Sequence, residues 1–305
     1  MSYDSIKLMN NFINLSSDET WSCIGPHITS HLDFNKLKNS INKRLYKEII
    51  KKFIGLSHHE YKKQRTEEVV KTMYDKKWST RDPEHITAYE GGNVPVNWNS
   101  KKFVIDGLGL SNLQTLRIMK LIEKIKPKSV LDVGCGNGER LFQLACRYPK
   151  IKFTGLELSN EGIETAKSIQ KLEQITSVLI NASPQKLVDL TAHKGINFVC
   201  ASAKKIPFED NSFDLVYTSL SLEQMELIRE YALKEIFRVT NQYSSFYEAF
   251  KDYNNKLPQV IYINLERYFR GSLKDLTNLG YKIVEIIDQI PQKTYMNAVF
   301  AIVKK

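Results

Sequence analysis

The chain has 305 residues, of which 42% are hydrophobic and 26% are charged. This length and apolar content can bury a complete α/β core and leave residues for a smaller additional region. The sequence has no run of about eighteen apolar residues and no leader pattern at its N-terminus, so we expect no transmembrane segment and predict a cytoplasmic location. The four cysteines form no C-x-x-C pair, which favours reduced thiols.

Positive charge is concentrated in the first quarter of the chain. The formal net charge is +10, and residues 36–78 hold thirteen Lys or Arg against five Asp or Glu. Such a region could be a solvated helix face, a surface for anions or membranes, or a nucleic-acid contact. Because lysine is abundant along the whole chain, we favour the solvated face and expect no nucleic-acid partner.

Residues 1–77 are predicted to be mainly helical. Hydrophobic residues recur at every fourth position, as on one face of an amphipathic helix, at Leu37, Ile41, Leu45, Ile49 and Phe53. His27 and His31 have the spacing of a metal-binding pair, but no third ligand or H-E-x-x-H pattern accompanies them, so no metal site is predicted. Residues 78–111 contain several glycines and prolines among aromatic residues, which breaks any long periodicity.

Helical and strand patterns alternate over residues 112–305. Helices are expected over 113–126, 161–170 and 223–238, and strands over 129–133, 152–157, 197–200, 213–219, 243–248, 281–288 and 296–303. This alternation predicts an α/β fold with a seven-stranded, mostly parallel sheet and helices on both faces. A short turn containing Pro291 is expected between the last two strands, which would form an antiparallel hairpin at the sheet edge.

Three alternating glycines follow the expected strand 129–133 and precede a helical pattern: Gly134, Gly136 and Gly138. Glycine lacks the Cβ that would bar a ligand, and it allows the positive φ angles of a tight turn. The helix that follows directs its free amides and its dipole at the same point. A dinucleotide site would need a glycine at position 139, which is Glu139 here. The pattern therefore predicts a site for a nucleotide-like ligand, with a glycine spacing that differs from that of a dinucleotide site.

Glu157 ends the second expected strand, about 20 residues beyond the glycines. A doubly wound sheet places an acid there against ribose hydroxyls, because a carboxylate can accept both hydroxyl protons of a vicinal diol. We therefore expect Glu157 to contact the sugar of the ligand.

Asp132, two residues before the first glycine, completes a pattern that resembles motif I of the class I S-adenosylmethionine-dependent methyltransferases. Segments 202–208, with a Pro-Phe turn, and 210–217, with a Phe-Asp strand start, are similar to later motifs of that family. The resemblance covers residues 112–305. It implies a Rossmann-like sheet, S-adenosylmethionine as cofactor, and a lid role for residues 78–111, for which a packed connector is the alternative.

The resemblance also implies a set of cofactor-binding residues: Asp132, Gly134, Cys135, Gly136, Asn137, Gly138, Glu157, Leu158, Ser202, Ala203, Ser219 and Leu220. Family members usually have an aspartate in place of Ser202, where it holds the adenine amino group. A serine hydroxyl can accept one such hydrogen bond, but without the assistance of a charge. This departure concerns the adenine contact and leaves the fold prediction unaffected.

Three polar residues are candidates for the chemistry. Glu223 and Gln224 follow the fourth strand, whose end faces the methyl group in the family, and Glu248 ends the fifth strand. Glu223 could take a proton or bind a cationic acceptor, and Gln224 could orient a hydroxyl. Alternatively, Glu223 favours the N-terminus of the helix that runs to Arg238, and Glu248 is a surface acid. Candidate aromatic walls of an acceptor pocket are Tyr89, Trp98 and Tyr247.

The sequence therefore predicts a methyltransferase that acts on a small-molecule acceptor, most simply on an oxygen of a surface-glycan or specialised-metabolite precursor. The segment 219–222 reads Ser-Leu-Ser-Leu, where nucleic-acid amino methyltransferases have an Asn/Asp-Pro-Pro-aromatic motif. This argues against a base amine as acceptor. An RNA methyltransferase that uses the basic region and a non-catalytic cofactor-binding partner protein are the alternatives, and a homodimer is compatible with the sequence.

Overall fold

The computed structural model describes residues 12–13, 15–29, 32–53, 64–79 and 92–305. The helices are α1 (Ser17–Ile24), α2 (Phe34–Phe53), α3 (Glu67–Ser79), α4 (Gly107–Ile125), α5 (Glu139–Arg147), α6 (Asn160–Gln170), α7 (Ser177–Asn181), α8 (Arg229–Val239), α9 (Leu257–Glu266) and α10 (Leu273–Asn278). The strands are β1 (Asn93–Trp98), β2 (Lys101–Asp106), β3 (Ser129–Val133), β4 (Lys152–Glu157), β5 (Asn197–Cys200), β6 (Phe213–Ser219), β7 (Thr240–Glu248), β8 (Lys282–Ile287), β9 (Gln292–Lys293) and β10 (Val299–Lys304).

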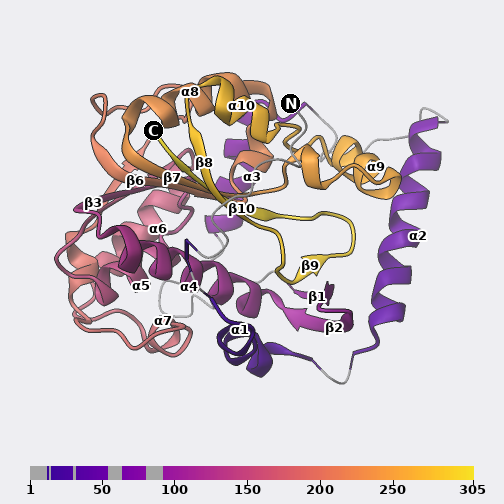
Figure 1. The fold of residues 1–305 in the computed structure, drawn as a ribbon, viewed down its shortest axis with the longest axis horizontal. Coiled ribbons are helices and arrows are strands. Elements are labelled where there is room, and N and C mark those ends of the chain that lie inside the picture. Colours follow the sequence, from indigo (N-terminus) through magenta and orange to yellow (C-terminus); the bar gives the residue numbers. More distant parts are fainter. Residues whose placement is uncertain (1–11, 14, 30–31, 54–63, 80–91) are drawn as a thin grey trace.

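The central sheet has seven strands in the order β5-β4-β3-β6-β7-β10-β8. Strands β5, β4, β3, β6 and β7 are parallel, whereas β10 is antiparallel to both of its neighbours. The chain leaves β3 toward β4 and β5 and later returns to the other side of β3 with β6, so the strand order reverses at β3. The structure confirms the predicted fold class, including the antiparallel edge (Figure 1).

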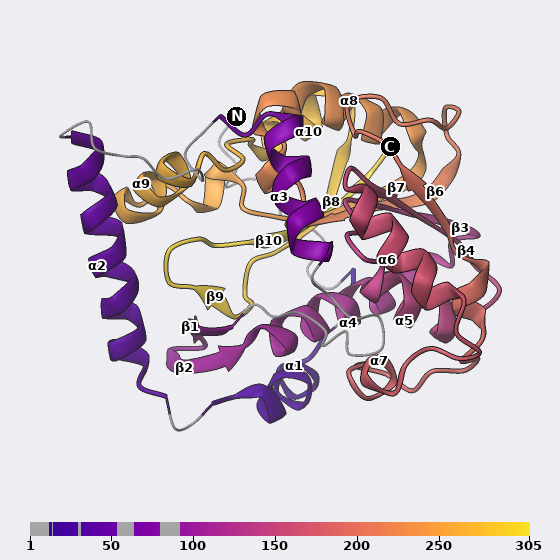
Figure 2. The ribbon, with the colours of Figure 1, turned by 180° about the vertical axis from the view of Figure 1, so that it is seen from behind.

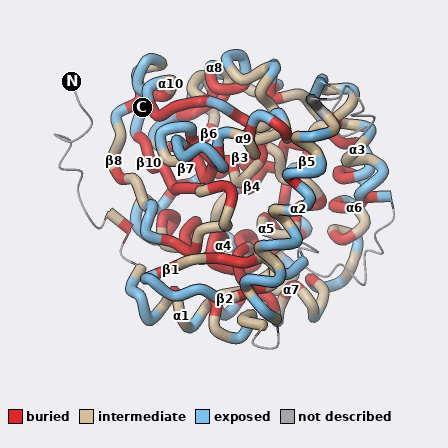
Figure 3. Tube along the Cα trace, turned by 90° about the vertical axis from the view of Figure 1, so that its right-hand side faces the viewer, coloured by how far each residue is buried: buried red, intermediate tan, exposed pale blue. Residues whose placement is uncertain are grey.

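Alternating side chains of the strands bury both faces of the sheet. Val130 of β3 contributes to a core shared with α4, α5 and α6, and its neighbour Leu131 to a core shared with α8 and α10. Figure 1 shows α8 and α10 on one side of the sheet and α4 and α5 on the other. The inner strands such as β3 are largely buried, and the outer faces of the surrounding helices are exposed (Figure 3). Burial on both faces explains why Val130, Leu131 and Val133 of β3 are all apolar.

The connection between β8 and β10 departs from the sequence prediction. Instead of a short turn, residues 288–298 extend outward and include β9, which pairs with β1 in a separate three-stranded sheet of order β2-β1-β9. The loop is braced by a hydrogen bond from Asn297 N to Asn254 Oδ1 (2.8 Å). Pro291 therefore lies in a long excursion, and the expected short turn was wrong.

The N-terminal helices lie against different parts of the molecule. Helix α1 shares a core with the β1–β2 hairpin and α4, and α2 packs through its apolar stripe against α9, as at Leu45 and Leu265. The predicted amphipathic helix is thereby confirmed. Helix α3 packs beside α6 (Figure 2).

Other sequence predictions concern metals, thiols and membranes. His27 Nδ1 lies 3.2 Å from Asp106 Oδ2, and His27 Nε2 lies 3.2 Å from Asn112 Nδ2, whereas His31 is outside the described residues. Within the ranges given above, no three His, Cys, Asp or Glu side chains gather as a metal site. All four cysteines are free thiols. None of the helices in those ranges is both long and apolar enough to span a bilayer.

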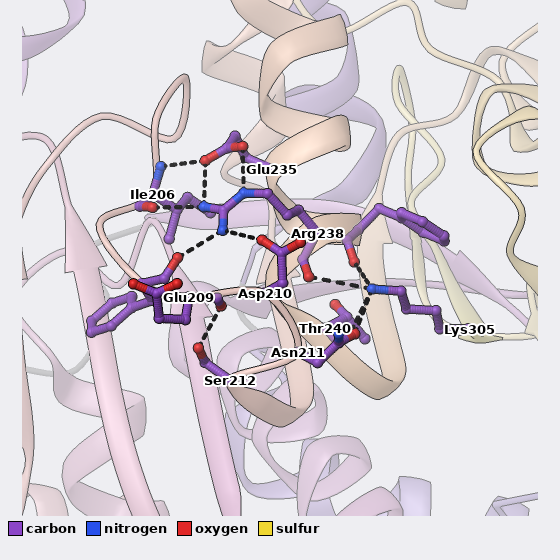
Figure 4. Close-up of polar contacts among 11 residues, drawn as sticks. Ile206, Glu209, Asp210, Asn211, Ser212, Glu235, Arg238, Thr240 and Lys305 are labelled. Carbon is purple, nitrogen blue, oxygen red and sulfur yellow. Dashed lines mark hydrogen bonds and ion pairs between the residues drawn. The ribbon is translucent and has the colours of Figure 1, made fainter.

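Arg238, in the last turn of α8, fastens the loop between β5 and β6 (Figure 4). Its guanidinium donates to both carboxylate oxygens of Glu235 (2.8 Å each), to Asp210 Oδ1 (2.8 Å), and to the carbonyls of Phe208 (2.7 Å) and Ile206 (2.9 Å). These bonds lower the pKa of Glu235. Charge-assisted bonds in such a network are individually stronger than neutral ones.

We expect Arg238→Met to lower the free energy of unfolding by about 1–3 kcal/mol, because several of these acceptors lose their partner while the site stays partly hydrated. Urea denaturation at neutral pH measures the change. Lys234→Met, at an exposed position on the same helix, is the matched control and should change stability by less than about 0.5 kcal/mol. Equal effects of the two substitutions would contradict the role of the network.

Candidate active site

A cavity of about 320 Å³ lies where β3, β4 and β6 end. The carboxyl ends of parallel strands beside the point of strand reversal are where doubly wound sheets bind ligands. The lining residues come from the glycine turn, the ends of β4 and β6, helix α4, and helix α3 with the residues just before it.

The glycine turn adopts a backbone that other residues rarely take. The φ angles of Gly134, Gly136 and Gly138 are 86°, 59° and 79°. The amides of Gly134 and Cys135 donate to the carbonyl of Leu156 on β4 (2.7 and 3.1 Å). A Cβ on Gly134 would lie 2.4 Å from the Cβ of Ser221. Both the angle and the space therefore require glycine at position 134.

Glu157 joins the glycine turn to the end of β4. Its Oε2 accepts a hydrogen bond from Gly136 N (2.9 Å) and its Oε1 accepts one from Ser159 N (2.9 Å). Burial raises the pKa of Glu157, and these amides oppose the shift. The carboxylate lines the cavity, and its remaining lone pairs match a vicinal diol.

One end of the cavity has a polar relay that the sequence did not predict as a unit. Arg140 Nη2 and Ser219 Oγ both donate to Gln114 Oε1, at 2.9 and 2.7 Å. The three residues line the cavity together. Arg140 could have been suspected because it directly follows the glycine turn. Gln114 gave no such signal, because it lies in α4, before the motif.

Helix α3 forms the roof of the cavity. The Trp78 ring lies against the glycine turn, where a Cβ on Gly136 would be 2.9 Å from it, and the Lys77 ammonium lies 4.6 Å from the centre of that ring. Asp75 Oδ1 accepts a hydrogen bond from Ser159 Oγ at the start of α6 (2.6 Å). Within the described part of residues 78–111, Trp78 and Ser111 line the cavity, whereas the β1–β2 hairpin does not. Other covering residues of α3, Val70, Tyr74 and Lys77, precede the segment in which a lid was expected.

Most of the predicted cofactor-binding residues do line the cavity: Gly134, Cys135, Gly136, Asn137, Glu157, Leu158, Ala203, Ser219 and Leu220. Three do not line it. Asp132 is buried below the turn, where burial raises its pKa to about 6. Gly138 is the N-cap of α5, and a Cβ there would meet the ring of Phe198. The hydroxyl of Ser202 donates to Glu67 of α3.

Glu223 and Gln224 lie together in the cavity, in the turn 222–224 after β6. Gln224 Nε2 donates to Glu223 Oε1 (3.1 Å), and Arg65 Nη1 donates to Gln224 Oε1. Burial raises the pKa of Glu223, and the charges of Lys293, Arg65 and Lys77 oppose this effect. The expected helix 223–238 begins only at Arg229, so Glu223 does not occupy its first turn and that alternative was wrong.

Glu248 is fully buried and does not line the cavity. Its Oε1 accepts hydrogen bonds from the amides of Ser221 (3.1 Å) and Leu222 (3.2 Å). Burial and the charge of Glu223 raise its pKa to about 8. Glu248 is therefore neither a surface acid nor a group in direct reach of an acceptor. It holds the loop that carries Glu223, in which Leu220 has a left-handed φ of 53°.

Two of the three predicted aromatic walls, Trp98 and Tyr247, lie away from the cavity. Trp98 packs against Trp21 with ring centres 4.8 Å apart and donates to the carbonyl of Gln289 (3.3 Å). Tyr247 lies against Phe300, with ring centres 4.6 Å apart. Neither lines the cavity, and Tyr89 is outside the described residues. The aromatic lining comes from α3: Tyr74 and Trp78, which are spaced four residues apart on one helix face.

Comparisons with known proteins find a methyltransferase domain in this chain. A family model described as a methyltransferase domain matches residues 131–247. The chain is 28% identical over 236 residues to an O-methyltransferase of Aspergillus nomiae, a match that covers 74% of this chain and 94% of that protein. It is 30% identical over 163 residues to a ubiquinone/menaquinone biosynthesis C-methyltransferase of Rickettsia prowazekii, covering 53% of this chain and about half (54%) of that protein.

Two solved structures share the fold. The cyclase SpnF matches with a TM-score of 0.53 at 17% identity, over 79% of this chain and 97% of SpnF. A geranyl diphosphate C-methyltransferase from Streptomyces coelicolor matches with a TM-score of 0.50 at 12% identity, over 77% and 97% of the two chains. Together with the matched domain, the sheet order and the glycine turn, these findings show a class I S-adenosylmethionine-dependent methyltransferase with a Rossmann-like fold. Its cofactor is S-adenosylmethionine.

We expect Gly134→Ala to weaken binding of S-adenosylhomocysteine at least about tenfold, because the new Cβ must displace Ser221 and the positive φ strains alanine. Isothermal titration calorimetry measures the affinity. Gly195→Ala is the matched control, since a Cβ there meets nothing within 4 Å. An unchanged affinity in folded Gly134→Ala would contradict the assigned turn.

Glu248 also predicts a pH dependence of stability. Its pKa rises from 4.5 in the unfolded chain to about 8 in the folded protein. The folded state therefore binds more protons between these values, and wild-type stability falls as pH rises through this window. Glutamine cannot ionise, so the free energy of unfolding of Glu248→Gln relative to wild type should increase by more than ~1 kcal/mol from pH 5 to pH 8. Chemical denaturation at several pH values measures the free energy of unfolding of both proteins. A constant difference between wild type and Glu248→Gln from pH 5 to pH 8 would refute this account.

Proposed function

We propose that this enzyme methylates an oxygen of a small-molecule acceptor and that Glu223 acts as the base. The observation that carries the proposal is the position of the Glu223 carboxylate, which shares one cavity with the glycine turn and Glu157. A hydroxyl acceptor must lose its proton during transfer, so a base within hydrogen-bond reach is needed.

The cavity residues fit S-adenosylmethionine. We assign Glu157 to the ribose hydroxyls and the Arg140–Gln114–Ser219 relay to the amino-acid end, where a guanidinium matches a carboxylate. The bare backbone of Gly134 and Gly136 lies between these groups. The bound cofactor supplies a methyl group already activated by its sulfonium charge. The enzyme contributes mainly by positioning and by exclusion of water beneath α3.

Glu223 is suited to remove a proton near neutral pH. Its raised pKa increases its basicity, and the nearby cations keep the carboxylate form accessible. Gln224 donates to Glu223 Oε1, so Oε2 is the oxygen that we assign to the acceptor hydroxyl. As the hydroxyl proton moves to Glu223, a lone pair of the acceptor oxygen becomes available for the methyl group.

The nearby charges act on the proposed base. Lys293, Arg65 and Lys77 all favour the carboxylate form of Glu223. The names of relatives support a small metabolite, since they include ubiquinone/menaquinone biosynthesis and a norajmaline N-methyltransferase of Rauvolfia serpentina. We propose a hydroxylated biosynthetic precursor, as in surface-glycan or specialised-metabolite pathways. Helix α2, which carries much of the basic region, does not line the cavity, and the two basic residues of that region that do line it, Arg65 and Lys77, act on Glu223.

We expect Glu223→Gln to lower the turnover number about 10²–10⁴-fold, because the hydroxyl proton loses its acceptor. Release of S-adenosylhomocysteine from a panel of hydroxylated acceptors, followed by mass spectrometry, measures turnover. Affinity for S-adenosylhomocysteine should stay within about threefold of wild type, since Glu223 holds the acceptor side. Exposed Glu230→Gln is the control. Full turnover in Glu223→Gln would rule out Glu223 as the base.

A further inference from the structure

The two ends of the cofactor cavity differ in chemistry. The Arg140–Gln114–Ser219 relay makes one end polar, and Glu157 lies beyond it. Apolar residues also line the cavity, and the part that they line is here called the apolar slot: Leu156, Leu158, Ala201 and Ala203 from β4 and the segments that follow β4 and β5, with Val70 and Ile228. With the amino-acid group at the polar end and the ribose at Glu157, the flat adenine base falls in the apolar slot.

Adenine in such a slot needs a hydrogen-bond acceptor for its 6-amino group, because an unpaired buried donor costs free energy. Ser202 stands at the sequence position that holds this group in the family, but it does not line the cavity. Its hydroxyl oxygen accepts a hydrogen bond from Lys204 N (2.9 Å), and its hydroxyl proton is donated to Glu67 Oε1. Ser202 is therefore bonded to a carboxylate that does line the cavity.

That carboxylate belongs to the first turn of α3. Glu67 lines the cavity with Ala201 and Ala203, which flank Ser202. Only its Oε1 is bonded to another residue of the described chain, so Oε2 has its full capacity as an acceptor. In the apolar slot, Glu67 is the acidic group placed for a donor on the base.

Contacts along α3 hold Glu67 in place independently of Ser202. Asp75 is bonded to Ser159 at the start of α6 (2.6 Å), and the Trp78 ring lies against Gly136. Just before the helix, Arg65 Nε donates to the carbonyl of Glu266 (2.8 Å). Contacts at both ends of the helix therefore fix its position over the slot.

We propose that Glu67 accepts the hydrogen bond from the adenine 6-amino group, in place of the aspartate that family members carry at the position of Ser202. Ser202 then serves as a positioning residue that orients Glu67. The residues that determine specificity for adenine then come from both α3 and the sheet. All contacts to the base therefore form only when α3 covers the cavity. The inference rests on S-adenosylmethionine being the cofactor and is independent of the acceptor.

A simpler role for Glu67 is stabilisation of the α3 N-terminus, where acids interact favourably with the helix dipole. Glu68 occupies the same turn but is exposed and does not line the cavity. The neighbouring pair thus offers a matched comparison, because both residues lie in the first turn of α3 but only Glu67 lines the cavity and is bonded to Ser202.

The test compares two ligands by calorimetry: S-adenosylhomocysteine and its analogue in which hydrogen replaces the 6-amino group. Wild type should prefer the adenine ligand at least about tenfold, as expected for a hydrogen bond to a carboxylate. In Glu67→Ala this ratio should fall to about one. In Glu68→Ala it should equal the wild-type ratio. The ratio isolates the base contact, since loosening of α3 would weaken both ligands alike.

The outcomes separate this inference from the proposed function. A wild-type ratio retained in Glu67→Ala, or an equal loss for both ligands, would show that Glu67 acts only on the helix and would overturn the inference. A wild type that binds neither ligand would refute the cofactor itself. Ser202→Ala should lower the ratio partially, because Glu67 keeps its charge but loses its orienting partner.

Discussion

The hydrogen bond from the Gly136 amide to the Glu157 carboxylate is the contact on which the site depends. It ties the glycine turn to the end of the neighbouring strand, and the bonds from Gly134 and Cys135 to Leu156 reinforce it. A turn without side chains needs such anchoring, because glycine loses more conformational freedom on folding than any other residue. The same carboxylate faces the cavity, so one group both shapes the binding surface and belongs to it.

Polar groups connect the roof of the site to three segments of the sheet domain. Asp75, Glu67 and Arg65 each bond to a different segment: the start of α6, the loop after β5, and the region around α9. Polar contacts of this kind are exchanged for water at modest cost. Trp78 adds an aromatic surface over the glycines.

The sequence alone was sufficient to predict those elements whose structure is determined by a local pattern of residues. All seven strands of the central sheet and the apolar stripe of α2 were predicted, because buried parallel strands and amphipathic helices have distinct periodicities. The glycine turn and Glu157 were predicted because their spacing is tied to the ligand. The predictions that failed concern residues whose positions depend on contacts between distant parts of the chain. The cover of the cavity is one example, because nothing in the sequence of α3 indicates which surface the helix packs against. Tyr247 and Glu248 could have been separated in part, since neighbours on a strand face opposite sides.

The pairing of β9 with β1 joins segments about 200 residues apart in the sequence. During translation the β1–β2 hairpin leaves the ribosome long before its third strand exists, so one side of β1 has no partner until residue 293 has emerged. An open strand edge invites pairing with other nascent chains or capture by chaperones. Because β9 has only two residues, its pairing with β1 adds few hydrogen bonds to the sheet. The three-stranded sheet can therefore be completed only after residue 293 has been synthesised.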